Sequence, residues 1–235
     1  MILPSDCWMK KTCARATNPN VEAPCNCGDT FCIKLFKLNY LFNEALISTK
    51  QREHVCMRLD EDMSDEQAFQ ELTKIQNNIK EFVSEGHNLY IYSNITGNGK
   101  TAWSLRLMQK YFETIWAETN LECKGLFVSV PKLLLSIKSS YSEENPYADH
   151  ILKNILNADL VVWDEVGVKA LSEHDHEQLL NLINSRIEQN KSNIYTSNLS
   201  PQDIREKIGD RLYSRIVNYS TTIQLRGADK RELFK

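Results

Sequence analysis

The chain has 235 residues, of which 42% are hydrophobic and 25% charged, and its formal net charge at pH 7 is −3. This is enough chain for one substantial hydrophobic core and a small accessory module, and the charge excludes a strongly basic nucleic-acid coat protein. No apolar run approaches the roughly 20 residues that span a bilayer, and the first residues lack a signal peptide's apolar stretch, so we expect a cytoplasmic protein with no membrane partner.

Five of the seven cysteines lie within residues 1–32. In a cytosolic protein such clustering favours a metal over disulfides. Four thiolates can hold a tetrahedral Zn²⁺, and we take the ligands to be Cys7, Cys13, Cys27 and Cys32, with Cys25 as the alternative to Cys27. Reduced cysteines in a partly ordered arm remain the alternative to a metal. The sequence thus predicts a Cys-rich zinc-binding module over residues 1–50, which a structural metal would stabilise.

Three segments follow the cysteines. Apolar residues at helical spacing predict a helix over residues 33–47, packed on the zinc module or docked against a partner helix. Residues 51–63 are polar and acidic without strong periodicity, which predicts a linker. An apolar stripe over residues 64–86, with Ser64 as the expected cap, opens a second domain that we assign to residues 64–235.

Residues 93–101 carry the first chemical motif, with the sequence Ser-Asn-Ile-Thr-Gly-Asn-Gly-Lys-Thr. They follow an apolar strand-like segment and precede an amphipathic helix, which is the order of a nucleoside triphosphate phosphate loop. Glycines let backbone amides approach the phosphates, and the helix N-terminus adds unpaired amides and a positive dipole end. The expected ATP-binding residues are Asn94, Ile95, Thr96, Gly97, Asn98, Gly99, Lys100, Thr101 and Ala102.

Two side chains of this loop have specific expected roles. Lys100 would bridge the outer phosphates, and the Thr101 hydroxyl would bind Mg²⁺. Asn94 stands where the motif has its first glycine. Asparagine tolerates a left-handed backbone better than other non-glycine residues, so we expect the loop to survive this change.

A second motif is the apolar run of residues 158–163, which ends in Asp164 and Glu165. Its lack of alternation predicts a parallel strand covered on both faces, and ligands bind at the carboxyl ends of such strands. Asp164 would hold Mg²⁺ through its water shell, and Glu165 would orient or deprotonate the attacking water. Two acids after a strand can also be a helix cap or a solvated turn, but the phosphate loop upstream favours an ATPase.

Strand-like and helix-like segments alternate through residues 86–235. The expected strands are residues 87–93, 125–130, 159–164, 193–197 and 221–226. Alternation of this kind predicts an α/β fold with a parallel five-stranded sheet and helices on both faces. The strand at 193–197 ends next to Asn198, which could reach between the γ-phosphate and the attacking water.

Residues 86–235 as a whole resemble the DnaC and DnaI type of helicase loader within the AAA+ ATPases, and more distantly the IstB transposition ATPase. The resemblance is carried by the order and spacing of residues 97–101, 161–165, 196–200, 209–215 and 229–231. It implies that Asn198 is a first sensor, that Arg215 is a finger on a neighbouring subunit's nucleotide, and that Arg231 is a second sensor within its own subunit. Arg211 is a rival for the finger.

The resemblance also implies partners and a function. It implies that the Cys-rich module docks on a hexameric replicative DNA helicase, that the chain self-associates with ATP and Mg²⁺, and that single-stranded DNA is bound in the assembly. The expected function is ATP-dependent loading of the helicase onto single-stranded DNA. Two alternatives stay open: an IstB-like transposition helper, and a nucleotide-gated adaptor with negligible hydrolysis.

Overall fold

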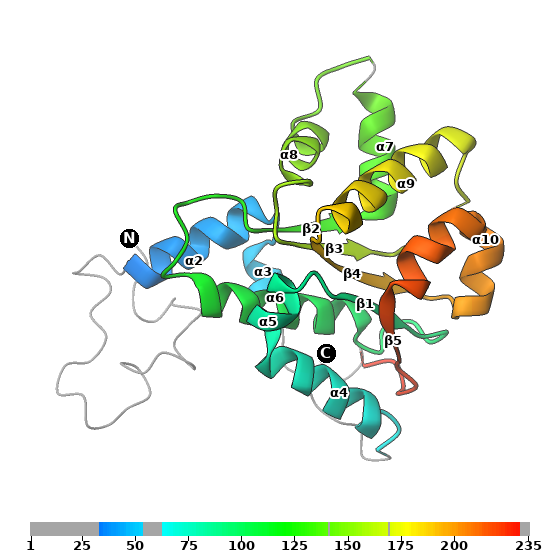
Figure 1. Cartoon of the computed structure of the whole chain (residues 1–235), viewed down its shortest axis with the longest axis horizontal. Coiled ribbons are helices and arrows are strands. Elements are labelled where there is room, and N and C mark those ends of the chain that lie inside the picture. The colour runs from blue at the N-terminus through cyan, green and yellow to red at the C-terminus, as the bar shows by residue number, and fades with distance from the viewer. Residues whose placement is uncertain (1–32, 54–62, 141, 169, 231–235) are drawn as a thin grey trace.

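The computed structural model describes residues 33–53, 63–140, 142–168 and 170–230, and within them five parallel strands form one sheet (Figure 1). The strands are β1 (Asn88–Tyr92), β2 (Gly125–Ser129), β3 (Leu160–Asp164), β4 (Ser192–Ser197) and β5 (Ser220–Gln224). Their order is β2-β3-β4-β1-β5, and every neighbouring pair is parallel. The predicted five-stranded parallel sheet is confirmed. β1 leads into the predicted phosphate loop, and β3 ends at Asp164. Because β4 lies between these two strands, its carboxyl end lies between the two motifs.

Helices cover both faces of the sheet (Figure 1). One face carries α2 (Ile33–Glu44), α4 (Glu66–Asn77), α5 (Ile79–Ser84) and α6 (Lys100–Ile115). The other face carries α7 (Val130–Ser139), α8 (Pro146–Asn154), α9 (Glu173–Glu188), α10 (Pro201–Tyr213) and the short π-helix η2 (Ser214–Asn218). Alternate residues of each strand face opposite layers, as the period of a strand requires. In β1, Leu89 and Ile91 join the first layer, whereas Tyr90 joins the second.

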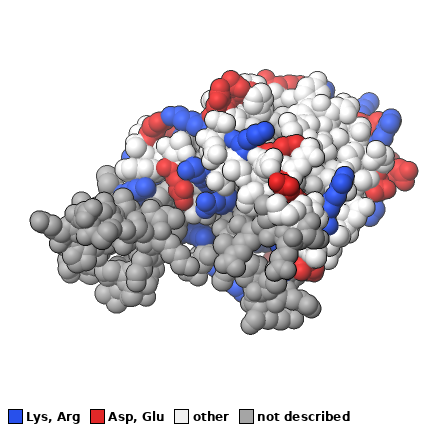
Figure 2. Space-filling view, turned by 90° about the horizontal axis from the view of Figure 1, so that it is seen from below, with Lys and Arg blue, Asp and Glu red and all other residues white. Residues whose placement is uncertain are grey.

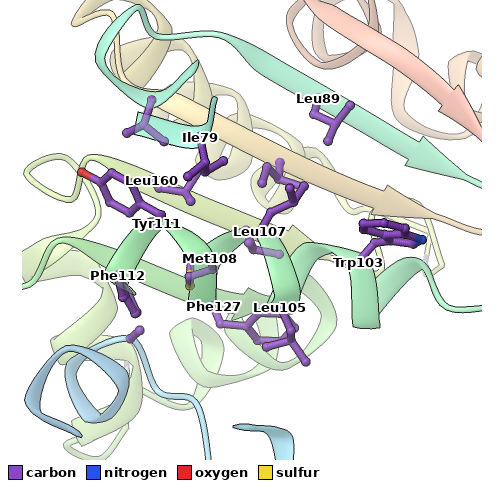
Figure 3. Close-up of a cluster of buried hydrophobic side chains, with 14 of the residues drawn as sticks. Ile79, Leu89, Trp103, Leu105, Leu107, Met108, Tyr111, Phe112, Phe127 and Leu160 are labelled. Atoms are coloured by element: carbon purple, nitrogen blue, oxygen red, sulfur yellow. The ribbon is translucent and has the colours of Figure 1, made fainter. Parts of the chain in front are cut away.

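Helix α6 is fixed against the sheet by its apolar side (Figure 3). Leu107, Met108 and Phe112 are fully buried. The Phe112 ring meets Phe42 edge to face, with ring centroids 5.2 Å apart. Burial of each large apolar side chain contributes about 1.5–3 kcal/mol, so this helix is held firmly, and its first residue is Lys100.

The N-terminal helix corrects one expectation. Residues 33–53, predicted to divide between the zinc module and the linker, pack in the core of the sheet domain. Leu38, Leu41 and Phe42 of α2 are buried in the same cluster as α6. Beyond α2, the Phe127 amide of β2 donates to the Ala45 carbonyl over 2.9 Å. The sequence showed a helix with one apolar side, but it could not show which surface that side covers.

The predicted linker also begins inside this packed unit. Helix α3 (Thr49–Glu53) includes Arg52, whose side chain is buried. Its guanidinium donates to the Ile47 carbonyl at 2.9 Å, to Asn43 Oδ1 at 2.6 Å and to Asn39 Oδ1 at 3.1 Å. The sheet unit therefore includes residues 33–53, while the assignment of residues 1–32 to a zinc-binding module lies outside the described residues.

The single helix expected over residues 64–86 is two helices, α4 and α5, that meet at Asn78. Its N-cap is Asp65 rather than Ser64, and the Asp65 side chain makes no capping hydrogen bond. The Asp65 carboxylate instead accepts the backbone amides of Arg226 at 2.5 Å and Gly227 at 3.1 Å. The Asp65 carboxylate thus bonds an amide 161 residues away instead of an amide of its own helix. This bond holds the segment after β5 against the start of α4.

The opposite end of the sheet is organised by the fully buried Arg186 of α9. Its guanidinium donates to Asn193 Oδ1 at 2.8 Å, to the Ala158 carbonyl at 2.8 Å and to the Ser192 carbonyl at 2.6 Å. Burial lowers the pKa of Arg186 to about 10, so the group stays charged at neutral pH. It thereby fixes the starts of β3 and β4. Among the described residues, no helix is both long and apolar enough to cross a bilayer.

Candidate nucleotide-binding site

The loop of residues 93–99 carries the chain from β1 into α6, as the sequence predicts. Gly97 and Gly99 have φ of +75° and +105°, in the left-handed region, and α6 begins at Lys100. Five described non-glycine residues have positive φ, and Asn94 is not among them. The loop therefore accommodates Asn94 without a left-handed backbone at this position. This position does not need glycine's conformational freedom, so a larger side chain fits there without strain.

Lys100 is buried at the centre of the loop. Its ammonium group donates to the Ile95 carbonyl at 2.9 Å, to Asn98 Oδ1 at 3.3 Å and to the Ser93 carbonyl at 3.4 Å. These acceptors are uncharged oxygens of the loop itself. A phosphate oxygen would offer the same ammonium a stronger, charge-assisted bond.

Asp164 lies at the carboxyl end of β3 and is buried. Its Oδ1 accepts hydrogen bonds from the Thr101 hydroxyl at 3.0 Å and from the Thr196 hydroxyl at 2.5 Å. Burial raises the pKa of Asp164 above its usual range, and the nearby Glu165 adds to this, while the two hydroxyls and Lys100 oppose it. The predicted Mg²⁺ pair, Thr101 and Asp164, is thus in direct contact. A buried carboxylate beside a hydroxyl is a donor set that fits Mg²⁺, which takes oxygen ligands.

Glu165 follows Asp164 in a strained conformation. Its φ is +64°, which is uncommon for a residue with a side chain, and the carboxylate is exposed. The Glu165 amide donates to Thr196 Oγ1 at 3.1 Å. Strain of this kind costs about 1–3 kcal/mol and clusters at functional sites, where the surroundings enforce it. Glu165 lines the same cavity as the phosphate-loop residue Lys100.

Lys100, Thr101 and Glu165 line one cavity of about 240 Å³ at the carboxyl edge of the sheet. Asp164 does not line it but contacts the lining residue Thr101. Asn198, the first-sensor candidate at the end of β4, also lines it. The lining residues are Thr96, Gly97, Gly99, Lys100, Thr101, Ala102, Glu165, Thr196, Ser197 and Asn198. The structure therefore brings the predicted phosphate loop, the acidic pair and Asn198 together. A larger cavity of about 470 Å³ lies at the opposite edge, next to Lys124, Asp159 and Lys191, and contains none of these groups.

Thr196 is the site residue that the sequence did not single out for a role. Its hydroxyl donates to Asp164 Oδ1 and accepts the Glu165 amide, so it links both acids to β4. The register places Thr196 opposite Ile91 of β1. The one available signal was its place near the carboxyl end of the strand, two residues before the predicted site residue Asn198.

The chain after β5 lies against the phosphate loop. The Lys230 amide donates to the Gly97 carbonyl at 3.0 Å, and Asn98 Nδ2 donates to the Leu225 carbonyl at 3.3 Å. This brings the segment that precedes Arg231 to the nucleotide cavity. Arg231 itself, and the zinc-ligand candidates Cys7, Cys13, Cys25, Cys27 and Cys32, lie outside the described residues.

Arg215 belongs to η2 and does not line the cavity of its own phosphate loop. Its Nη1 donates to the Tyr219 hydroxyl at 3.4 Å. Arg215 and Arg211 instead line a separate surface hollow of about 480 Å³ between α9 and α10. An arginine placed there can meet a phosphate only on another molecule, so both candidates for a finger in trans remain.

No extended basic surface marks a nucleic-acid site on the face in Figure 2, where Lys and Arg side chains are interspersed with Asp and Glu side chains. Two lysines on α7, between β2 and β3, are already engaged. Lys132 lies 3.9 Å from the centre of the Tyr147 ring, and Lys138 forms an ion pair with Asp175 at 2.8 Å. The structure therefore does not single out a DNA-binding residue.

Comparisons with known proteins agree with this site. Residues 50–232 match the family model of IstB-like ATP binding proteins. Over 92 residues, 39% of this chain, the sequence is 27% identical to the replicative helicase loader DnaC of Buchnera aphidicola subsp. Baizongia pistaciae, and the match spans 37% of that loader. The fold is similar to a crystal structure of the DnaC helicase loader, with a TM-score of 0.61 and 20% identity over 76% of this chain and 100% of that one. It is also similar to a crystal structure of DnaI, with a TM-score of 0.56 and 19% identity over 73% and 88% of the two chains.

Proposed function

Because the chain belongs to the family of IstB-like ATP binding proteins, we propose that it is an ATPase that loads a hexameric replicative DNA helicase onto single-stranded DNA. The observation that carries the ATPase proposal is the contact of Thr101 with Asp164 beside Lys100 and Glu165. The loader proposal rests on the sequence match to DnaC. The protein would work in the cytoplasm.

The proposed mechanism assigns each residue one task. Bound ATP would supply the phosphoanhydride bond that is broken, and Mg²⁺ would neutralise the negative charge of the phosphates. Lys100 and the amides at the start of α6 hold the phosphates, while Thr101 and Asp164 hold the metal. Glu165 orients the attacking water and accepts its proton, and Asn198 positions that water against the γ-phosphate.

Arg215 would complete the site of a neighbouring subunit. A guanidinium supplied across an interface stabilises the charge of the transferring phosphoryl group only after assembly. Hydrolysis would then be slow in the isolated chain and faster in an ATP-dependent oligomer. Arg211 is the rival for this role, and Arg231 is the proposed second sensor within the same subunit.

The N-terminal segment would bind the helicase. We propose residues 1–32 as the docking module, held by Zn²⁺ on Cys7, Cys13, Cys32 and either Cys25 or Cys27. This boundary differs from the one expected at residue 50 because α2 and α3 pack in the ATPase core. Residues 54–62 would connect α3 to α4, which belongs to the same core.

Co-purification tests the loader proposal. Tagged full chain is recovered from its native cells with and without ATP and Mg²⁺, and bound proteins are identified. The expected result is a replicative helicase that is lost when residues 1–32 are deleted, with the ATPase fold confirmed by its circular dichroism. The matched control, Lys100→Ala, separates nucleotide-dependent binding from constitutive docking. A transposase in place of the helicase would support the transposition helper, to which the family description also applies.

A further inference from the structure

Three potential metal ligands meet on the side of the molecule where α2 borders β2 (Figure 1). One ligand atom each from Glu44, Cys123 and His150 lies within 4.8 Å of the other two. Glu44 is the last residue of α2, Cys123 precedes β2, and His150 belongs to α8. None of them lines the cavity around Lys100.

We propose that Glu44, Cys123 and His150 form a zinc site, separate from the N-terminal cysteines, that fastens α2 to the ATPase core. The donor set is one carboxylate oxygen, one sulfur and one imidazole nitrogen. Each is a common zinc ligand, and the combination of sulfur with nitrogen selects zinc over Mg²⁺ or Ca²⁺, which prefer oxygen alone. A water molecule would complete a tetrahedral site.

The distances suit this assignment after a small movement. Bonds of about 2.0–2.3 Å from zinc to nitrogen, oxygen and sulfur put tetrahedral ligands roughly 3.3–3.8 Å apart. The present separations of up to 4.8 Å would therefore shrink by about 1 Å. All three side chains are half-buried, so they could close on an ion without breaking the core.

The hydrogen bonds around the cluster show what zinc would replace. His150 Nε2 lies 2.8 Å from the Glu44 carbonyl, and Cys123 Sγ donates to the Gly125 carbonyl at 3.4 Å. His150 Nε2 is 4.0 Å from the Glu44 carboxylate. On binding zinc, Cys123 Sγ would give up its weak hydrogen bond and form a bond to the metal. The positive charge of the zinc ion would offset the negative charges of the Glu44 carboxylate and the Cys123 thiolate.

The site would stabilise a specific junction. Glu44 directly precedes Ala45, whose carbonyl accepts the Phe127 amide of β2. A metal bound here would lock the end of α2 against β2 and α8. The segment of residues 1–32, joined to α2, would then be anchored to a fixed point on the ATPase core. Zinc should raise the melting temperature, and the increase should grow with the logarithm of the free zinc concentration once this exceeds the dissociation constant.

The first test uses metal content. The full chain and its Glu44→Gln, Cys123→Ser and His150→Gln variants are equilibrated with Zn²⁺ against a chelator of known affinity. The expected result is one zinc fewer in each variant, or a loss of affinity greater than the 10–100-fold typical of an outer-shell partner. His87→Gln, which alters an exposed histidine paired with Glu85, is the control and should bind as the wild type does. Equal zinc content and affinity in all chains would overturn the proposal.

A second test starts from a chain that keeps Glu44, Cys123 and His150. In a full chain with Cys7, Cys13, Cys25, Cys27 and Cys32 all changed to Ser, Co²⁺ serves as a coloured substitute for zinc. A thiolate-to-cobalt absorption band is expected, and it should vanish when Cys123→Ser is added. If the five-fold variant gives no such band, Cys123 does not ligate the ion and the proposal fails.

Discussion

The Asp229 carboxylate lies directly over Gly97 of the phosphate loop, so that a Cβ built on this glycine would be 1.9 Å from Asp229 Oδ1. Gly97 also has φ of +75°, a conformation that side chains disfavour. Together with the bond from the Lys230 amide to the Gly97 carbonyl, this contact ties the C-terminal segment to the loop that would hold ATP.

Gly97→Ala should therefore lower the melting temperature and weaken ATP binding. The left-handed backbone costs an alanine about 1–2 kcal/mol, and the clash with Asp229 must add to it. The matched control is the same Gly97→Ala change in an Asp229→Ala background, because it keeps the backbone cost at residue 97 and removes the carboxylate that the new Cβ would meet. Thermal unfolding measures both. Equal losses for the two variants would mean that the contact with Asp229 contributes nothing.

Lys100→Ala should abolish ATP binding and leave the fold intact. In the contacts described above, the Lys100 ammonium group donates to uncharged oxygens of the loop, and water can replace it there when the side chain is removed. The phosphates of ATP, in contrast, would lose a charged partner. Isothermal titration with ATP and Mg²⁺ measures the affinity, and circular dichroism checks the fold. Lys110→Ala, on the same helix but away from the cavity, should bind as the wild type does. Unchanged affinity in Lys100→Ala would refute the assignment of this loop.

Thr196→Val should reduce ATP hydrolysis more than ATP affinity. Valine keeps the shape but removes the hydroxyl that bonds Asp164 and the Glu165 amide, and a buried group left without its partner costs about 1–3 kcal/mol. Thr196→Ser keeps the hydroxyl and should retain most of the turnover. Steady-state kinetics separate the two effects. If valine and serine variants hydrolyse ATP equally, Thr196 does not position the acids.

Asp164→Asn should be more stable than the wild type at neutral pH without Mg²⁺, yet inactive. Burial raises the pKa of Asp164 above its ordinary value of 3.8, so the folded state holds the proton more tightly than the unfolded state. The free energy of unfolding of the wild type therefore falls as pH rises through the raised pKa. Below pH 3.8, where both states are protonated, the advantage of asparagine should disappear. Denaturant titrations across this range measure it, and an advantage that grows on acidification would contradict the argument.

Mixing subunits tests the role of Arg215. Neither Arg215→Ala nor Glu165→Gln chains should hydrolyse ATP alone. In a mixture, an Arg215→Ala chain keeps its own Glu165 and can receive Arg215 from a Glu165→Gln neighbour, so part of the activity should return. The same experiment with Arg211→Ala decides between the two candidates. Absence of recovery at every mixing ratio would count against a role in trans.

The sequence predicted the sheet and most of the site because their signals are local. The apolar runs that end at Tyr92 and Asp164 identify buried strands, and the carboxyl ends of parallel strands share one edge. The Thr101 to Asp164 contact follows directly from that topology. Each of these inferences needs only the residue types, the pattern of apolar residues and the order of strands and helices along the chain.

The expectations that failed depend on contacts between distant residues. The expected cap Ser64 is not the N-cap of α4; that residue is Asp65, and two amides beyond β5 take its carboxylate. The helix at residues 33–44 shows an apolar side, but only the folded chain shows that this side meets α6. Glu44, Cys123 and His150 are far apart in the sequence, and only the fold brings them together from different elements.

The bond from the Phe127 amide to the Ala45 carbonyl satisfies a backbone donor of β2 that would otherwise be open to another chain. β2 is an outer strand of the sheet, and an uncovered outer strand offers its amides and carbonyls to any other extended chain. Ala45 occupies part of that edge through its bond to Phe127. A shortened protein that starts at residue 50, where the family match begins, would expose β2 together with the apolar surface under α2. Such a fragment should form strand-paired oligomers that imitate the nucleotide-dependent assembly, so oligomerisation is best measured on chains that retain α2.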